Sequence, residues 1–107
     1  MKYYHGTTDK FFISNEILPP IITGNLREEW RDKYQDKVFL TTSLLSAQYF
    51  AYKACQKYSG HGIIYEVEPI GVIYYPNPNT NEYIVDKAKI IKVVSKYDKI
   101  LKKWIIV

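Results

Sequence analysis

The chain has 107 residues, of which 47% are hydrophobic and 16% aromatic, and its formal net charge is +4. This length is enough for one hydrophobic core, so we expect a single domain over residues 1–107, and the composition excludes a disordered chain. The lysines are scattered rather than gathered in blocks. The positive charge therefore indicates solubility first, and it leaves binding to nucleic acid as an open alternative.

The cysteine content and the apolar runs indicate a cytoplasmic setting. The single Cys55 cannot form an intramolecular disulfide, which fits a reducing compartment. Met1 and Lys2 are followed at once by Tyr-Tyr-His-Gly rather than by the apolar core of a signal peptide. The apolar runs are too short to span a bilayer. We therefore expect a cytoplasmic protein with no membrane partner.

The N-terminal third of the chain predicts a strand, an extended segment and a charged loop. Residues 1–5 predict a short strand, and Gly6 behind it permits a close approach of another backbone. Prolines keep residues 17–22 out of a helix. Residues 23–37 predict a surface loop that contains a short helix. This loop is either a plain connection or a lid that presents Trp30 to an acceptor.

The rest of the chain predicts strands around one main helix. The predicted strands cover residues 38–41, 63–68, 72–75, 82–85, 90–94 and 103–107. The predicted helix covers residues 44–58, where Leu45, Tyr49 and Tyr52 recur at helical spacing. In the strand over 63–68, even-numbered and odd-numbered residues alternate between two faces. Residues 103–107 form either a last core strand or a dimer edge. The pattern indicates an α+β domain with mostly antiparallel strands.

No metal or phosphate-binding motif is present in the sequence. His5 and His61 lack further ligands at the spacing of a zinc site, so we expect no metal. No glycine-rich loop of the kind that cradles phosphates occurs. A cysteine-histidine nucleophile built on Cys55 is formally possible, but the predicted position of this residue in a helix core argues against it.

A better constellation consists of His5, Phe39, Tyr49 and Glu82. Three of these residues lie at or beside the ends of predicted strands and one lies on the helix, so one cleft could collect them. Aromatic rings could sandwich a flat heterocycle. A carboxylate could hold a ribose hydroxyl, or stabilise positive charge on a sugar carbon while a glycosidic bond breaks. The alternative is an aromatic core cluster with an unrelated acid.

Four segments together resemble the ADP-ribosyltransferase superfamily. They are Tyr4-His5-Gly6-Thr7, Val38-Phe39-Leu40-Thr41, Ser46-Ala47-Gln48-Tyr49 and Asn81-Glu82-Tyr83-Ile84-Val85. The likeness is to the diphtheria-toxin-like branch with a His-Tyr-Glu signature, which includes the poly(ADP-ribose) polymerases. Residues 64–69 with Gly71 are also similar to a strand of the small rifamycin-modifying ADP-ribosyltransferases. The resemblance covers residues 3 to about 95.

The resemblance implies a fold of split, strongly bent β-sheets that hold NAD in a cleft. It implies an enzyme that uses NAD as a substrate, transfers ADP-ribose to an acceptor and releases nicotinamide. The acceptor could be a protein, a nucleic acid or a small molecule. Small domains of this kind include antibiotic-modifying enzymes, toxins and phage effectors. The oligomeric state cannot be inferred from the sequence.

The resemblance also implies residue roles. The implied NAD-binding residues are His5, Gly6, Thr7, Phe39, Ser46, Tyr49 and Glu82. Glu82 would hold the nicotinamide ribose and stabilise an oxocarbenium-like state, and His5 would bond a ribose hydroxyl; these two are the catalytic candidates. The Gly6 backbone and Ser46 would hold the nicotinamide carboxamide. Tyr49 would stack on the nicotinamide ring.

One position departs from the signature. Phe39 stands where the family usually has tyrosine, so ring stacking survives but the hydroxyl hydrogen bond is lost. The rifamycin-modifying enzymes carry their acid near the loop that here reads Tyr74 to Asn77, and no acid stands there. Glu82 is therefore the acidic candidate. A catalytically weak or silent NAD-binding module and an NAD glycohydrolase are the alternatives to a transferase.

Overall fold

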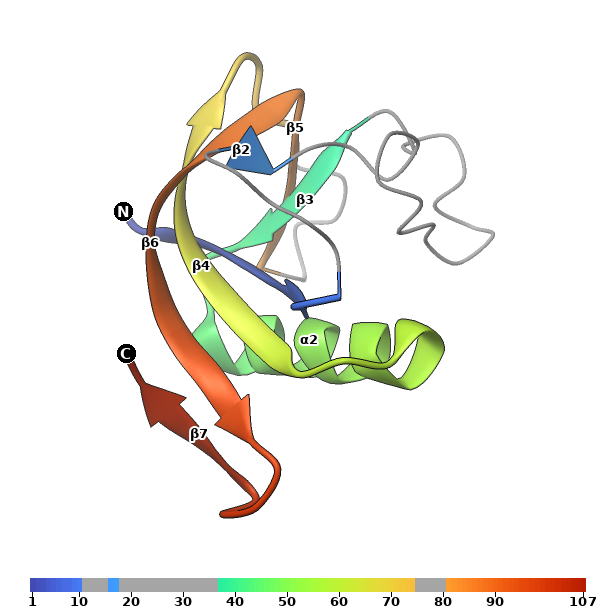
Figure 1. The fold of residues 1–107 in the computed structure, drawn as a ribbon. Coiled ribbons are helices and arrows are strands. Elements are labelled where there is room, and N and C mark those ends of the chain that lie inside the picture. Colours follow the sequence, from blue (N-terminus) through green and yellow to red (C-terminus); the bar gives the residue numbers. More distant parts are fainter. Residues whose placement is uncertain (11–15, 18–36, 75–80) are drawn as a thin grey trace.

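The computed structural model describes residues 1–10, 16–17, 37–74 and 81–107 (Figure 1). The described residues form an α+β structure, which confirms the predicted class. Its elements are β1 (Tyr3–Thr8), β2 (Glu16–Ile17), β3 (Val38–Thr41), α2 (Leu44–Tyr58), β4 (Gly62–Ile70), β5 (Glu82–Val85), β6 (Lys87–Asp98) and β7 (Lys103–Ile106). The predicted bounds of β3, α2 and β5 agree with those observed.

The strands form one antiparallel sheet that bends back on itself. Its order is β2-β6-β4-β1-β3-β5, and β7 pairs with β6 outside this path. Strands β5 and β6 are therefore four places apart, which in a flat sheet would be about 19 Å. In the chain, however, only Asp86 separates them, and one residue spans at most about 7 Å. The sheet must curl to bring the two strands together.

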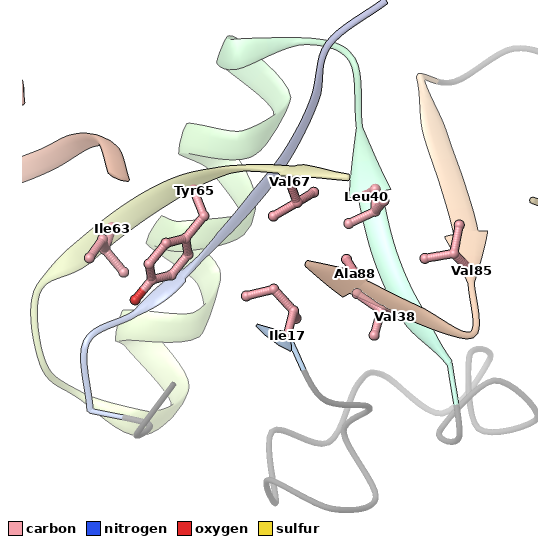
Figure 2. Packing of buried hydrophobic residues seen from close by; sticks show 8 residues of the cluster. All are labelled: Ile17, Val38, Leu40, Ile63, Tyr65, Val67, Val85 and Ala88. Carbon is pink, nitrogen blue, oxygen red and sulfur yellow. The ribbon is translucent and has the colours of Figure 1, made fainter. Parts of the chain in front are cut away.

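The bend encloses a cluster of apolar side chains. Its buried members are Ile17, Val38, Leu40, Ile63, Tyr65, Val67, Val85 and Ala88. Figure 2 shows these side chains gathered from five strands. Odd-numbered residues of β4 enter this cluster while Ile64 packs on the other face, which confirms the predicted alternation.

Helix α2 covers the opposite face of the sheet, mainly over β1 and β4. It begins behind Ser43, whose Oγ accepts a hydrogen bond of 3.2 Å from the N–H of Ser46. Its buried residues are the small Ala47 and Ala51. A Cβ built on Gly6 would overlap the carbonyl oxygen of Ala47. The helix can lie this close to β1 because Gly6 has no side chain.

The structure corrects the predicted faces and lengths of several elements. Leu45, Tyr49 and Tyr52 are 77%, 56% and 58% exposed, so the residues whose spacing predicted the helix do not form its packed face. The helix packs through alanines because its backbone lies so close to Gly6 on β1 that larger side chains would not fit between them. Strand β1 does not end at residue 5 but continues to Thr8, since β4 pairs with it along its whole length.

The C-terminal part of the chain also differs from the prediction. Strand β6 begins before the predicted residue 90 and continues past residue 94. Strand β7 is not a core strand, because Ile106 and Val107 are exposed. The predicted strand over 72–75 is not formed in its described part, residues 72–74. There, Tyr74 makes a single β-bridge with Ile84. The predicted charged loop with Trp30, most of the extended segment over 17–22 and the turn before residue 81 lie outside the described residues.

In the described part of the chain, no helix combines the length and the apolar character that crossing a membrane requires.

The packing of α2 generates a stability test. We expect Ala47→Leu to lower the free energy of unfolding by about 1–3 kcal/mol or more, because the added carbons meet β1 at its closest approach. We expect Leu45→Ala on the solvent side to change it by less than about 0.5 kcal/mol. Chemical denaturation of both variants measures this. A larger loss for Leu45→Ala than for Ala47→Leu would show that the helix packs through its large apolar residues.

Candidate functional site

The sheet is weakly joined between β1 and β3. Among the described residues, strand β1 pairs with β4 through six residues, but with β3 only through Tyr4, which lies opposite Thr41. Strand β3 in turn pairs with β5 along its length, and there Thr41 lies opposite Glu82. Tyr4, Thr41 and Glu82 thus form a row across three neighbouring strands. At the usual strand spacing the backbones of Tyr4 and Glu82 are about 10 Å apart, although nearly eighty residues separate them in the chain.

The side chain of His5 connects β1 to β3 next to the Tyr4–Thr41 pair. Its side chain is buried, with 6% exposed, and its Nδ1 lies 2.9 Å from the carbonyl oxygen of Phe39 on β3. A carbonyl oxygen only accepts hydrogen bonds, so Nδ1 must carry the proton. In neutral His5 the lone pair is then on Nε2, which can accept a hydrogen bond from a hydroxyl group.

Glu82 is the first residue of β5 and is unusually buried for a carboxylate. The residue is 8% exposed, and its Oε1 is closed off from solvent. Glutamate is seldom buried to this extent, because removing a carboxylate from water is costly. Buried acids of this kind occur both at functional sites and in structural networks. The burial of Glu82 is therefore a reason to regard it as the acid of the site.

The strand register decides which faces these side chains share. Residues directly opposite each other in paired strands point to the same side. Phe39 and Glu82 therefore lie on the face that carries α2, as does the position of Gly6. His5 and Thr7 alternate to the other face, and Thr7 is fully buried there. His5 and Glu82 approach the gap between β1 and β3 from opposite faces of the sheet.

Helix α2 contributes the remaining two predicted residues in different ways. Ser46 is in its first turn, next to the Ala47 that contacts Gly6, so Ser46 and Gly6 lie at the same end of the site. Tyr49 is two residues from both buried alanines, which places it on the outer side of the helix. Its ring is exposed, with Phe50 at a centroid distance of 6.1 Å. The structure thus does not gather the four predicted residues in one cleft: Tyr49 lies on the outer side of α2, and His5 lies on the opposite face of the sheet from Phe39 and Glu82.

Sequence reasoning gave no role to Thr41, which the structure puts at the centre. Thr41 is fully buried, pairs with both neighbouring strands, and its Oγ1 accepts a hydrogen bond of 3.1 Å from the N–H of Ser43. It thereby links the row that contains Glu82 to the start of α2. The signal in the sequence was the position of Thr41 in one of the four motifs, but only the register shows what it joins.

The other reactive residues lie away from this site. Burial raises the pKa of the Cys55 thiol above its ordinary value, and a hydrogen bond with Thr8 offsets only part of this effect. A catalytic thiol needs the opposite shift. His61 lies 3.5 Å from Asp9 at the far end of β1. Among the residues that the structure describes, no three His, Cys, Asp or Glu side chains cluster as metal ligands.

No family model matches the chain, and no curated protein matches it. The functional assignment therefore depends on the residues and on their geometry.

The hydrogen bond of His5 predicts a tautomer. At a pH where the ring is neutral, we expect His5 to carry its proton on Nδ1, because the carbonyl of Phe39 can only accept. Long-range ¹⁵N–¹H correlation spectra distinguish the two ring nitrogens, and the exposed His61 gives an internal reference. A neutral His5 protonated on Nε2 would contradict the arrangement described.

The raised pKa of Cys55 predicts that its thiol reacts slowly with alkylating reagents. At neutral pH less of it is thiolate than of an ordinary cysteine, so alkylation by iodoacetamide should be slower than that of free cysteine. Unfolding in guanidinium should restore the ordinary rate. Faster alkylation in the folded protein than in the unfolded one would reinstate Cys55 as a nucleophile.

Proposed function

We propose that this protein is an NAD-dependent mono-ADP-ribosyltransferase that transfers ADP-ribose to an acceptor and releases nicotinamide. The observation that carries the proposal is the buried Glu82, which one intervening strand separates from the buried His5 and its Gly6 neighbour. A fixed carboxylate close to aromatic and hydrogen-bonding groups suits a reaction in which positive charge develops on a sugar. The four motifs that resemble the superfamily contain these same residues.

In the proposed reaction, the bond between the nicotinamide nitrogen and the ribose C1′ breaks. Its electron pair leaves with nicotinamide, which becomes neutral. The sugar passes through an oxocarbenium-like state, whose charge the Glu82 carboxylate stabilises. The nucleophilic atom of the acceptor then bonds to C1′ and loses its proton. If water is the acceptor, the same steps give free ADP-ribose, which is the glycohydrolase alternative.

The other residues bind and orient NAD in this proposal. Because His5 lies on the other face of the sheet from Glu82, its Nε2 would accept a hydrogen bond only from a ribose hydroxyl that enters the space between β1 and β3. Ala47 covers the Cα of Gly6 and β4 pairs along one side of β1, so a ligand would meet the Gly6 backbone along the side that faces β3. Ser46 lies at the same end and would help to hold the carboxamide. Phe39 would supply the stacking face, whereas Tyr49 would have to turn inward from its exposed position to stack.

Phe39 supports a second candidate function. A phenyl ring stacks on a heterocycle, but it cannot donate the hydrogen bond that tyrosine gives in the family signature. A module that binds NAD or ADP-ribose without turning it over would keep the stacking ring. The two candidates differ in one measurable property, the breaking of the nicotinamide bond.

The proposal predicts that Glu82 controls turnover. We expect the purified protein to release nicotinamide from labelled NAD, and Glu82→Gln to lower kcat about 100-fold or more, since it removes the charge that opposes the oxocarbenium. Chromatography of the products separates nicotinamide, free ADP-ribose and modified acceptors. Free ADP-ribose as the sole product would identify a glycohydrolase.

The matched control is Glu68→Gln, which changes an exposed glutamate on β4 and should leave turnover unchanged. If the wild-type protein releases no nicotinamide but binds NAD, the binding module replaces the transferase. If turnover occurs and Glu82→Gln leaves it intact, the assignment of Glu82 is wrong.

A further inference from the structure

A separate groove lies between the C-terminal half of α2 and the hairpin of β6 and β7. It has a volume of about 450 Å³, and the residues that define it are Tyr52, Gln56, Gly62, Tyr97, Lys99 and Trp104. The groove exists because α2 packs on β1 and β4, while the hairpin extends past the helix without cover (Figure 1). It lies at the end of α2 opposite to Ser46, so it is distinct from the site of Glu82.

Aromatic rings line both sides of this groove. Tyr97 lies opposite Trp104 in the pairing of β6 with β7, and both lie next to Gly62, which leaves room for the indole. A Cβ at Gly62 would lie 2.8 Å from Cη2 of Trp104. The rings of Tyr97 and Trp104 meet edge to face at 5.6 Å. On the helix side, the exposed Tyr52 has its hydroxyl hydrogen-bonded to Nε2 of Gln56 at 2.7 Å, which restricts its orientation.

The elements that form the two walls carry a net positive charge, and Lys99 is the lysine among the residues that line the groove. Helix α2 has two lysines and no acidic residue, and residues 92–107 have five lysines and one acidic residue, Asp98. The remaining residues together carry more acidic than basic groups. Oδ1 of Asp98 accepts hydrogen bonds from the N–H groups of Ile100 and Leu101 in the hairpin turn. The carboxylate of Asp98, the one acidic residue of these two elements, is therefore hydrogen-bonded within the hairpin turn.

We propose that this groove binds single-stranded nucleic acid, with bases stacked on Tyr52 and Trp104 and phosphates near Lys99. Aromatic rings beside basic groups are the combination that binds unpaired bases without strong sequence preference, and here the exposed Tyr52 and the half-buried Trp104 lie beside Lys99. A purely apolar ligand would not need the lysines, and a compact anion would not need three rings. The inference does not depend on the chemistry proposed for Glu82.

The test is the binding of a fluorescein-labelled oligodeoxythymidylate of about 12 nucleotides, followed by anisotropy without NAD. We expect Tyr52→Ala to weaken binding about tenfold through the loss of stacking. We expect Lys99→Gln to flatten the slope of log K against log salt by about 0.7, since one phosphate contact is lost. Both residues are exposed, so folding should survive, which circular dichroism checks.

The matched controls are Tyr74→Ala and Lys10→Gln, an exposed ring and an exposed lysine outside the groove. The proposal is overturned if the oligonucleotide does not bind at low salt, or if the controls weaken binding as much as the groove variants do. It is also overturned if inorganic polyphosphate competes as well as unlabelled oligonucleotide, because charge alone would then account for binding. Glu82→Gln should bind the oligonucleotide normally, so this result stands apart from the NAD assay.

Discussion

The pairing of Thr41 with Tyr4 on one side and with Glu82 on the other is the contact on which the candidate site depends. It brings a carboxylate from late in the chain to within two strands of the N-terminal histidine. The Tyr4–Thr41 pair is also the only register pair between β1 and β3 in the described residues. Beyond it, the ring of His5 reaches the backbone of β3. The proposed site thus lies beside a strand that pairs along its whole length with one neighbour and through one residue with the other.

The close contact of Gly6 with Ala47 holds α2 against β1. It fixes the start of the helix beside the row that contains Glu82. At the other end of α2, the aromatic groove with Trp104 lies between the helix and the C-terminal hairpin. The proposed NAD site and the proposed nucleic-acid groove therefore lie at opposite ends of α2.

Local patterns in the sequence predicted the elements better than their packing. The bounds of β3, α2 and β5 followed from compact runs with clear caps, such as Ser43. The packed face of α2 did not follow, because the exposed Leu45 and Tyr52 are larger and more apolar than the alanines that make the contact. The strand order was not predictable either. It requires the chain to pass from β5, at one end of the order, through Asp86 into β6, which is four places away. Motifs selected His5 and Glu82, but only the register shows that they approach from opposite faces.

The central claim is that NAD binds where β1 and β3 separate. A crystal of the protein soaked with NAD or nicotinamide tests this most directly. We expect the nicotinamide to contact the backbone of Gly6 beside Phe39, with the Glu82 carboxylate at hydrogen-bond distance from the hydroxyls of the adjoining ribose. Density for the ligand elsewhere on the protein, or a bound ribose that Glu82 does not contact, would contradict the account.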